Sequence, residues 1–158
     1  MQQLLRPLCG PVSLALVALL LCACARVNDT GLRLVSTTQD AYLIVNGQLL
    51  AGNVLLVPDR TGRVSFAGGK GGISACSGSM RYTATNSGEM DVRCSGGTQV
   101  TLQTTLLSET RGYGYGRTAQ GVSSVVFGLS DPDSRAFLTV PAGKTLVIGA
   151  ENGAMELR

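Results

Sequence analysis

Side chains that could do covalent or acid–base chemistry are few in this sequence. It has five cysteines and no histidine, so neither a Ser-His-Asp triad nor a Cys-His pair can be assembled. Glu89 and Asp91 form a suggestive pair, because alternate residues of a strand share a face and glycoside hydrolases use two carboxyl groups. Charged residues are usually exposed, so we favour a solvated strand face with Arg81 or Arg93 nearby. No catalytic residue is predicted.

Two other polar motifs resemble ligand-binding loops. Asp131 and Asp133 flank Pro132 without the further oxygen ligands of a calcium loop, so we expect a turn and a helix cap. Residues 68–72 read Gly-Gly-Lys-Gly-Gly, but a phosphate loop needs Ser or Thr directly after its Lys. An inter-strand loop is expected there. The sequence thus predicts neither a metal site nor a cofactor.

Residues 111–117 alternate glycine with tyrosine between two arginines. In a strand, the three glycines share one face and the tyrosines share the other. We favour an architectural role, in which glycine relieves crowding where a barrel strand bends and tyrosine covers it. The alternative is recognition, because tyrosine suits contacts with a peptide, glycan or protein. The candidate binding residues are Arg111, Tyr113, Tyr115 and Arg117.

Residues 1–23 form an apolar leader with one positive charge, Arg6, before an uncharged run. The run is too short to span a bilayer, which takes about 20 residues in a helix. Leu21-Cys22-Ala23-Cys24 resembles the lipobox of a bacterial lipoprotein precursor that signal peptidase II cleaves. This resemblance implies that Cys24 becomes the acylated N-terminus. The alternative is an ordinary secretory signal, cut at an Ala-x-Ala-like site in the same place.

The same resemblance implies a location and a domain layout. Lipoproteins of this class carry three acyl chains, which hold a protein stably on a membrane. Their inner-membrane retention signal is an Asp directly after the acylated cysteine, where this chain has Ala25. The implied location is therefore the outer membrane, facing the periplasm, with the inner membrane and the cell surface as alternatives. The layout is a signal peptide at 1–23, a short tether at 24–31 and one domain at 32–158.

Two cysteines, Cys76 and Cys94, remain beyond the leader and Cys24. In an exported protein they are expected to bond to each other. A redox or metal-binding pair is the weaker interpretation, because the spacing is not Cys-x-x-Cys and no histidine completes a zinc site. Closing a loop of this length stabilises a fold by about 3 kcal/mol on the chain-entropy account.

Short apolar and β-branched runs between Gly, Asn and Asp predict strands throughout the domain. Asn46-Gly47 predicts a type I′ hairpin turn. A short helix is expected near 131–138, capped by Asp131 and with Pro132 in its first position. The fold class is therefore all-β, a single compact antiparallel β-barrel or β-sandwich. The predicted strands are 32–36, 42–45, 48–50, 54–57, 63–67, 80–85, 89–94, 98–107, 112–117, 122–129, 145–148 and 154–157.

Charge and motifs together limit the function. The chain has 13 Lys and Arg against 10 Asp and Glu, scattered along its length, so it lacks the basic cluster that nucleic-acid binding needs. We expect a non-catalytic binding or structural role in the cell envelope. The expected partners are the membrane, through the lipid on Cys24, and an envelope protein, peptide or glycan. The alternatives are a hydrolase of envelope glycans that uses Glu89 and Asp91, and a small periplasmic hydrolase inhibitor.

Overall fold

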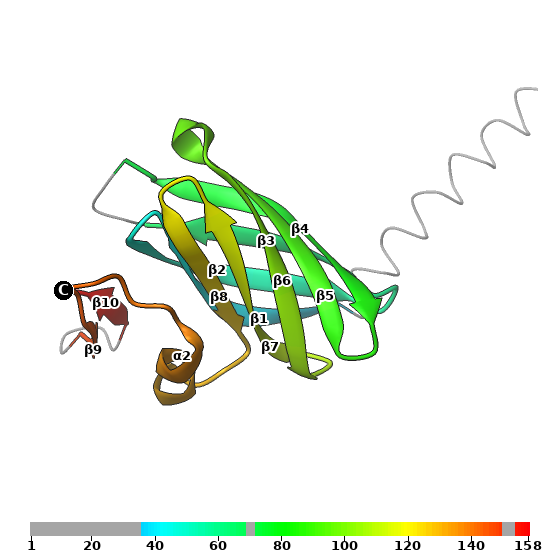
Figure 1. Cartoon of the computed structure of the whole chain (residues 1–158). Coiled ribbons are helices and arrows are strands. Elements are labelled where there is room, and N and C mark those ends of the chain that lie inside the picture. Colours follow the sequence, from blue (N-terminus) through cyan, green and yellow to red (C-terminus); the bar gives the residue numbers. More distant parts are fainter. Residues whose placement is uncertain (1–35, 69–71, 150–153) are drawn as a thin grey trace, which may run out of the picture. The chain divides into compact units, whose positions relative to one another are not determined.

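The computed structural model describes residues 36–68, 72–149 and 154–158. Within these ranges eight antiparallel strands close into a barrel, in which each strand pairs with the next and β8 pairs with β1 (Figure 1). The all-β prediction is confirmed, and the architecture is the barrel rather than the sandwich. The strands are β1 Thr37–Val45, β2 Gln48–Val57, β3 Thr61–Ala67, β4 Ala75–Ala84, β5 Ser87–Cys94, β6 Gln99–Ser108, β7 Arg111–Thr118 and β8 Gly121–Phe127.

Alternation along the strands builds the barrel interior. In β5 the even-numbered residues from Gly88 to Cys94 are buried and the odd-numbered residues lie on the outer face, because successive side chains of a strand point to opposite sides. Phe66, Met80 and Phe127 are among the large apolar side chains that fill the interior. An eight-stranded barrel has just enough room for such side chains. The interior is therefore a packed hydrophobic core.

The predicted Asn46-Gly47 turn is confirmed. Asn46 has a φ of 50° and Gly47 a φ of 72°, and Val45 pairs with Gln48 across the turn. A type I′ turn requires positive φ at both central residues. This hairpin joins β1 to β2 and sets their register.

Several strand predictions were too short, among them that for β1, which begins at Thr37 rather than residue 42, and one falls mostly outside the described residues. The sequence predicted separate strands at 48–50 and 54–57, but β2 runs through Gly52 without a break. A β-carbon on Gly52 would lie 2.6 Å from the Cα of Phe66, so this glycine permits a close approach of β3 rather than ending β2. β4 begins at Ala75 instead of residue 80. Of the strand predicted at 32–36, residues 32–35 are not described.

The predicted disulfide is present between Cys76 and Cys94. The two residues lie directly opposite each other on β4 and β5, and their Cα atoms are 3.9 Å apart. Both side chains are buried in the barrel core. The bond therefore joins strands that the hydrogen-bond ladder already pairs, and it holds their register.

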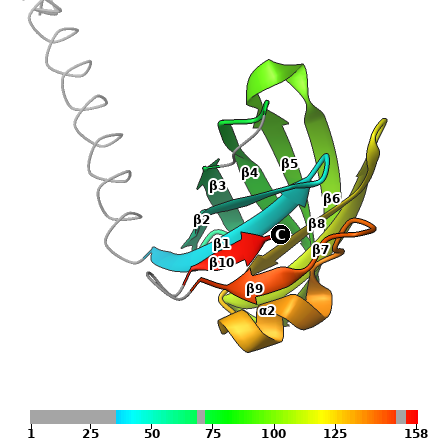
Figure 2. The ribbon, with the colours of Figure 1, turned by 90° about the vertical axis from the view of Figure 1, so that its left-hand side faces the viewer.

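After β8 the chain forms a second layer outside the barrel. This C-terminal segment contains α2 Asp131–Phe137, β9 Leu146–Ile148 and β10 Met155–Leu157, with β9 and β10 paired antiparallel. Figure 2 shows the segment, in orange and red, on the side of the barrel where β1, β7 and β8 lie. Ile44 and Val126 are fully buried beneath it, in a cluster with Leu138, Leu146 and Met155.

The predicted helix is present, but its cap is Ser130 rather than Asp131. The Ser130 hydroxyl accepts a hydrogen bond from the Asp133 N–H at 3.4 Å, and Asp131 and Pro132 lie within the first turn. Asp131 instead accepts a hydrogen bond from the Tyr42 hydroxyl at 3.1 Å, which joins the helix to β1. Among the described residues, no helix combines the length and apolar character needed to cross a membrane.

Candidate functional site

The outer side of β4, β5, β6 and the end of β7 carries polar side chains. The ribbon of the C-terminal segment does not lie over these strands (Figure 2). We call this surface the polar face. Strand register places its residues in cross-strand rows, since Arg81 pairs with Glu89 and Glu89 with Gln103. The residues of the polar face are Ser77, Ser79, Arg81, Glu89, Asp91, Arg93, Gln99, Thr101, Gln103, Tyr115 and Arg117.

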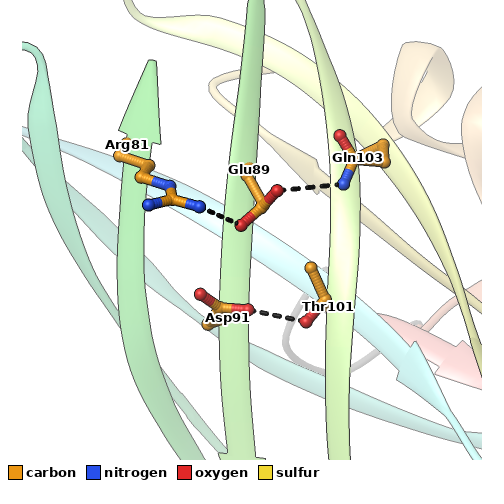
Figure 3. Close-up of polar contacts among 5 residues, drawn as sticks. All are labelled: Arg81, Glu89, Asp91, Thr101 and Gln103. Carbon is orange, nitrogen blue, oxygen red and sulfur yellow. Dashed lines mark hydrogen bonds and ion pairs between the residues drawn. The ribbon is translucent and has the colours of Figure 1, made fainter. Parts of the chain in front are cut away.

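Glu89 is held by both of its neighbours in its row. The Arg81 guanidinium donates to its Oε1 at 2.6 Å, and the Gln103 amide donates to its Oε2 at 3.2 Å (Figure 3). The Glu89 side chain is 22% exposed and that of Arg81 is 66% exposed. Both oxygens of this half-buried carboxylate are therefore engaged, and the guanidinium that it contacts is exposed.

Asp91 lies one row further along β5, on the same face. Its Oδ1 accepts a hydrogen bond from the Thr101 hydroxyl at 2.6 Å (Figure 3), and the residue is exposed. The predicted carboxylate pair thus shares a face, with Arg81 beside it as expected. Each carboxylate is oriented by its own donor on β6. The arrangement offers fixed hydrogen-bond acceptors to a ligand that lies across the strands.

A groove with a volume of about 770 Å³ runs over β4, β5 and β6 and reaches β7. Its floor is strand backbone at Gly78, Val92 and Val100. The guanidinium groups of Arg93 and Arg117 form no hydrogen bond and no ion pair within the part of the chain that the structure describes. The polar lining residues are Ser77, Ser79, Asp91, Arg93, Gln99, Thr101 and Arg117.

The glycine face of β7 is packed against its neighbours, as the architectural interpretation predicted. A β-carbon on Gly112 would lie 2.6 Å from the Thr105 carbonyl oxygen, and one on Gly114 would lie 2.8 Å from that of Gln103. Real side chains do not tolerate such distances to backbone. The glycines of β7 therefore allow β6 and β7 to approach closely inside the barrel.

The tyrosine face of β7 is divided between two environments. Tyr113 stacks on Phe137 of α2 with ring centroids 4.3 Å apart, so its ring packs the helix against the barrel. Tyr115 is 41% exposed and contacts Tyr113 edge to face at 5.7 Å. Partial burial, and to a smaller degree Tyr113, raises the pKa of Tyr115 above its ordinary value.

Of the four candidate binding residues in β7, two join the polar face. Tyr115 lies opposite Gln103, and Arg117 lines the groove. Arg111 is exposed at the other end of the strand, and Tyr113 lies under the helix. The sequence prediction grouped these four together, but the structure brings only the last part of β7 to the groove.

Other residues singled out in the sequence have local structural roles or lie outside the described ranges. Asp133 accepts a hydrogen bond from the Ser130 hydroxyl at 2.8 Å, in keeping with the turn-and-cap interpretation. The described residues contain no cluster of three or more metal-ligating side chains. Cys24 and the lipobox are not among the residues that the structure describes.

Sequence reasoning missed most of the groove lining. Ser77 and Ser79 lie in the part of β4 that was not predicted as a strand. Gln99 and Thr101 lie in a correctly located strand, where they alternate with buried Val100 and Leu102. That alternation was a usable signal, because it places both polar residues on one outer face.

Comparisons with known proteins assign no family to this chain. No protein-family model matches the chain, and no curated protein matches its sequence. The chain is similar to a solved structure described as a redesigned β-barrel, with a TM-score of 0.46 and 20% sequence identity over 60% of this chain and 90% of the other. The likeness is to a barrel fold, and it carries no information on function.

Proposed function

We propose that this chain is a lipid-anchored protein of the bacterial cell envelope that acts by binding, without catalysis, through its polar face. The anchor is the lipid on Cys24, and the location is the periplasmic side of the outer membrane. The observation that carries the binding role is the uncovered groove, in which Arg93 and Arg117 lack partners among the described residues. An envelope protein, peptide or glycan fits this surface.

The support for the anchor comes from the sequence. Leu21 and Ala23 stand three and one residues before Cys24, as the lipobox requires, and Ala25 replaces the Asp of inner-membrane retention. A triacylated protein does not leave the membrane on the time scale of its function. Binding therefore takes place at the membrane surface, where a tethered domain meets partners at high effective concentration.

The support for a non-catalytic role comes from the surroundings of the two carboxylates. A carboxyl group that serves as a general acid is typically desolvated in an apolar pocket. Glu89 instead contacts the Arg81 guanidinium and the Gln103 amide, and Asp91 is exposed and bonded to Thr101. These contacts suit recognition better than proton transfer.

Replacing Cys24 with serine tests the anchor. The Cys24→Ser protein should lack acylation and accumulate as precursor or as an aberrantly processed form, because serine offers no thiol for the lipid. Detergent partitioning and intact mass measure both effects. An unchanged mature mass and unchanged membrane partitioning would refute the lipoprotein assignment.

Filling the groove tests the binding role. Ser79 is exposed and lines the groove, so Ser79→Tyr should block a ligand without disturbing the core. Asn53 is exposed on β2, outside the groove, and Asn53→Tyr is the matched control. Capture of envelope components from solubilised membranes by the full chain should fall with Ser79→Tyr and persist with Asn53→Tyr. Equal capture by all three proteins would contradict binding at the polar face.

A further inference from the structure

We infer that the groove of the polar face binds an acidic oligosaccharide, a chain of sugar units that carry carboxylate groups. This inference rests on the proposed function and names the class of ligand at the same site. Three features of the groove lead to it: the two arginines without partners, the other hydrogen-bonding groups that line it, and the exposed tyrosine ring at its margin.

The positions of the two arginines favour an extended ligand with more than one acidic group. Arg93 lies on β5 and Arg117 on β7, with β6 between them. Neighbouring strands are about 4.8 Å apart, so the two strands are separated by about 10 Å. Guanidinium groups bind carboxylates through paired, charge-assisted hydrogen bonds. A ligand that satisfies both arginines therefore crosses β6 and presents an anionic group at each end.

The other polar groups that line the groove favour a ligand that also carries hydroxyls. Asp91 lines the groove with its Oδ1 bonded to Thr101, and a carboxylate can only accept hydrogen bonds. Its negative charge repels a ligand whose polar groups are all anionic, whereas a sugar hydroxyl can donate to it. Ser77, Ser79 and Gln99 can both donate and accept. Alternating acidic groups and hydroxyls are the chemistry of a uronic acid oligomer.

The floor and the margin of the groove favour a sugar over an acidic peptide. The floor is backbone at Gly78, Val92 and Val100, which leaves a broad strip rather than separate pockets for side chains. Tyr115 lies two residues from Arg117 on the same face of β7 and is 41% exposed. An exposed tyrosine ring offers an apolar surface with a polar tip, which suits the C–H face and the hydroxyls of a sugar ring.

Titration of the full chain in detergent with two probes tests this inference. The acidic probe is an oligomer of galacturonic acid, and the neutral probe is a malto-oligosaccharide of equal length. Calorimetry should detect binding of the acidic probe and little binding of the neutral one. Affinity for the acidic probe should fall as sodium chloride is raised, because salt screens exposed charges.

A charge-matched pair of double variants locates the binding. Arg93→Gln with Arg117→Gln should weaken binding of the acidic probe about tenfold or more, because hydrogen bonds between charged groups are lost. Arg111→Gln with Arg135→Gln removes the same charge from exposed residues away from the groove and should change the affinity less than about threefold. Tyr115→Ala should weaken binding by an intermediate factor.

The outcomes separate this inference from the proposed function. No binding of the acidic probe, equal binding of both probes, or equal losses in the two double variants would each overturn the acidic oligosaccharide. If Ser79→Tyr still abolishes capture from membranes while the galacturonic acid oligomer does not bind, the binding role stands and this ligand class is wrong. Capture of a protein or acidic peptide at the groove, without binding of the oligomer, has the same meaning.

Discussion

Thr105 and Val126 lie in one cross-strand row of the barrel wall, on either side of Tyr113, yet their surroundings are opposite. Val126 is fully buried under the C-terminal segment, whereas Thr105 is exposed. Beyond Thr105 the row continues to Ser87 on β5, beside the polar face. The wall thus has a covered side on β1, β7 and β8 and an uncovered side on β4 to β6, and the boundary runs through β7.

The two sides differ in how many faces of each strand are buried, and the sequence pattern of the strands differs accordingly. On the covered side, the apolar run at 43–45 and that at 125–127 bury side chains on both faces of the strand. On the uncovered side, apolar residues of β5 and β6 alternate with polar ones. Two-sided burial requires continuous apolar runs, and one-sided burial requires alternation. The covered side contributes to stability through both faces of its strands, whereas β4 to β6 contribute mainly through their inner face.

The largest effect is expected from placing a carboxylate at Val126. Val126→Asp leaves an uncompensated charge between the barrel and the C-terminal segment and should destabilise the fold by about 3–5 kcal/mol. Thr105→Asp, in the same row, should cost about 1 kcal/mol or less, because its side chain stays in water. Chemical denaturation of both variants measures the two costs. Similar costs would show that the C-terminal segment does not seal the covered side.

The second effect concerns the uncovered side, which no described residue of the C-terminal segment overlies and whose strands β4 and β5 are joined by the disulfide. Replacing Cys76 and Cys94 together with alanine should cost about 3 kcal/mol on the chain-entropy account. Hydrogen exchange should rise first in β4 and β5 and later in β1 and β8, since exchange follows local stability. Uniform loss of protection over all strands would show that the bond stabilises the barrel as a whole rather than this side.

The third effect is a difference in stability between variants of Tyr113 and Tyr115, whose side chains point to the same face of β7. Tyr113→Ala removes the ring that stacks on Phe137 and should cost about 2 kcal/mol, less than a fully buried aromatic residue. Tyr115→Ala should change stability by about 0.5 kcal/mol or less and should instead reduce binding at the polar face. Thermal melts with parallel binding measurements check both. A larger loss of stability for Tyr115→Ala would place the boundary elsewhere.

Local patterns in the sequence were enough for most of the elements but not for their assembly. The prediction of a turn at Asn46-Gly47 needed only two adjacent residues, and it is confirmed. The prediction of a disulfide needed only the number of cysteines left in an exported chain, and the bond between Cys76 and Cys94 is present. Barrel closure depends on the pairing of β8 with β1, which is distant in sequence and leaves no local pattern. The sequence therefore left the barrel and the sandwich open.

The same reason explains which parts of the candidate site were found. Glu89 and Asp91 were placed on one face because they alternate within a single strand. The groove needed the register of β4, β5 and β6, which brings Ser79, Asp91 and Thr101 side by side. The helix cap was misassigned by one residue, because Ser130 and Asp131 are both good capping residues and the choice depends on the contact between Asp131 and Tyr42.

The smallest effect is a pH dependence of the contact between β1 and α2 on the covered side. Burial, with smaller contributions from the charge of Asp131 and the hydrogen bond to it, raises the pKa of Tyr42 above 10.0. A raised pKa means that the folded state favours the protonated phenol, so its contribution is complete below pH 10 and is lost as pH rises through the folded-state value. Tyr42→Phe should cost about 1 kcal/mol near neutral pH through the lost hydrogen bond. Denaturation curves at increasing pH should then converge for the parent and the variant above pH 10, because the parent loses the hydrogen bond that the variant already lacks.

Tyr82→Phe is the matched control. The Tyr82 hydroxyl donates to the Glu109 carbonyl oxygen at 2.7 Å, a contact that does not involve α2, and the pKa of Tyr82 is also raised. Hydrogen exchange separates the two tyrosines: alkaline pH should expose α2, β9 and β10 in the parent and in Tyr82→Phe, but produce a smaller change in Tyr42→Phe. Parallel stability curves for the parent and Tyr42→Phe beyond pH 10 would show that this hydroxyl does not hold the C-terminal segment on the barrel.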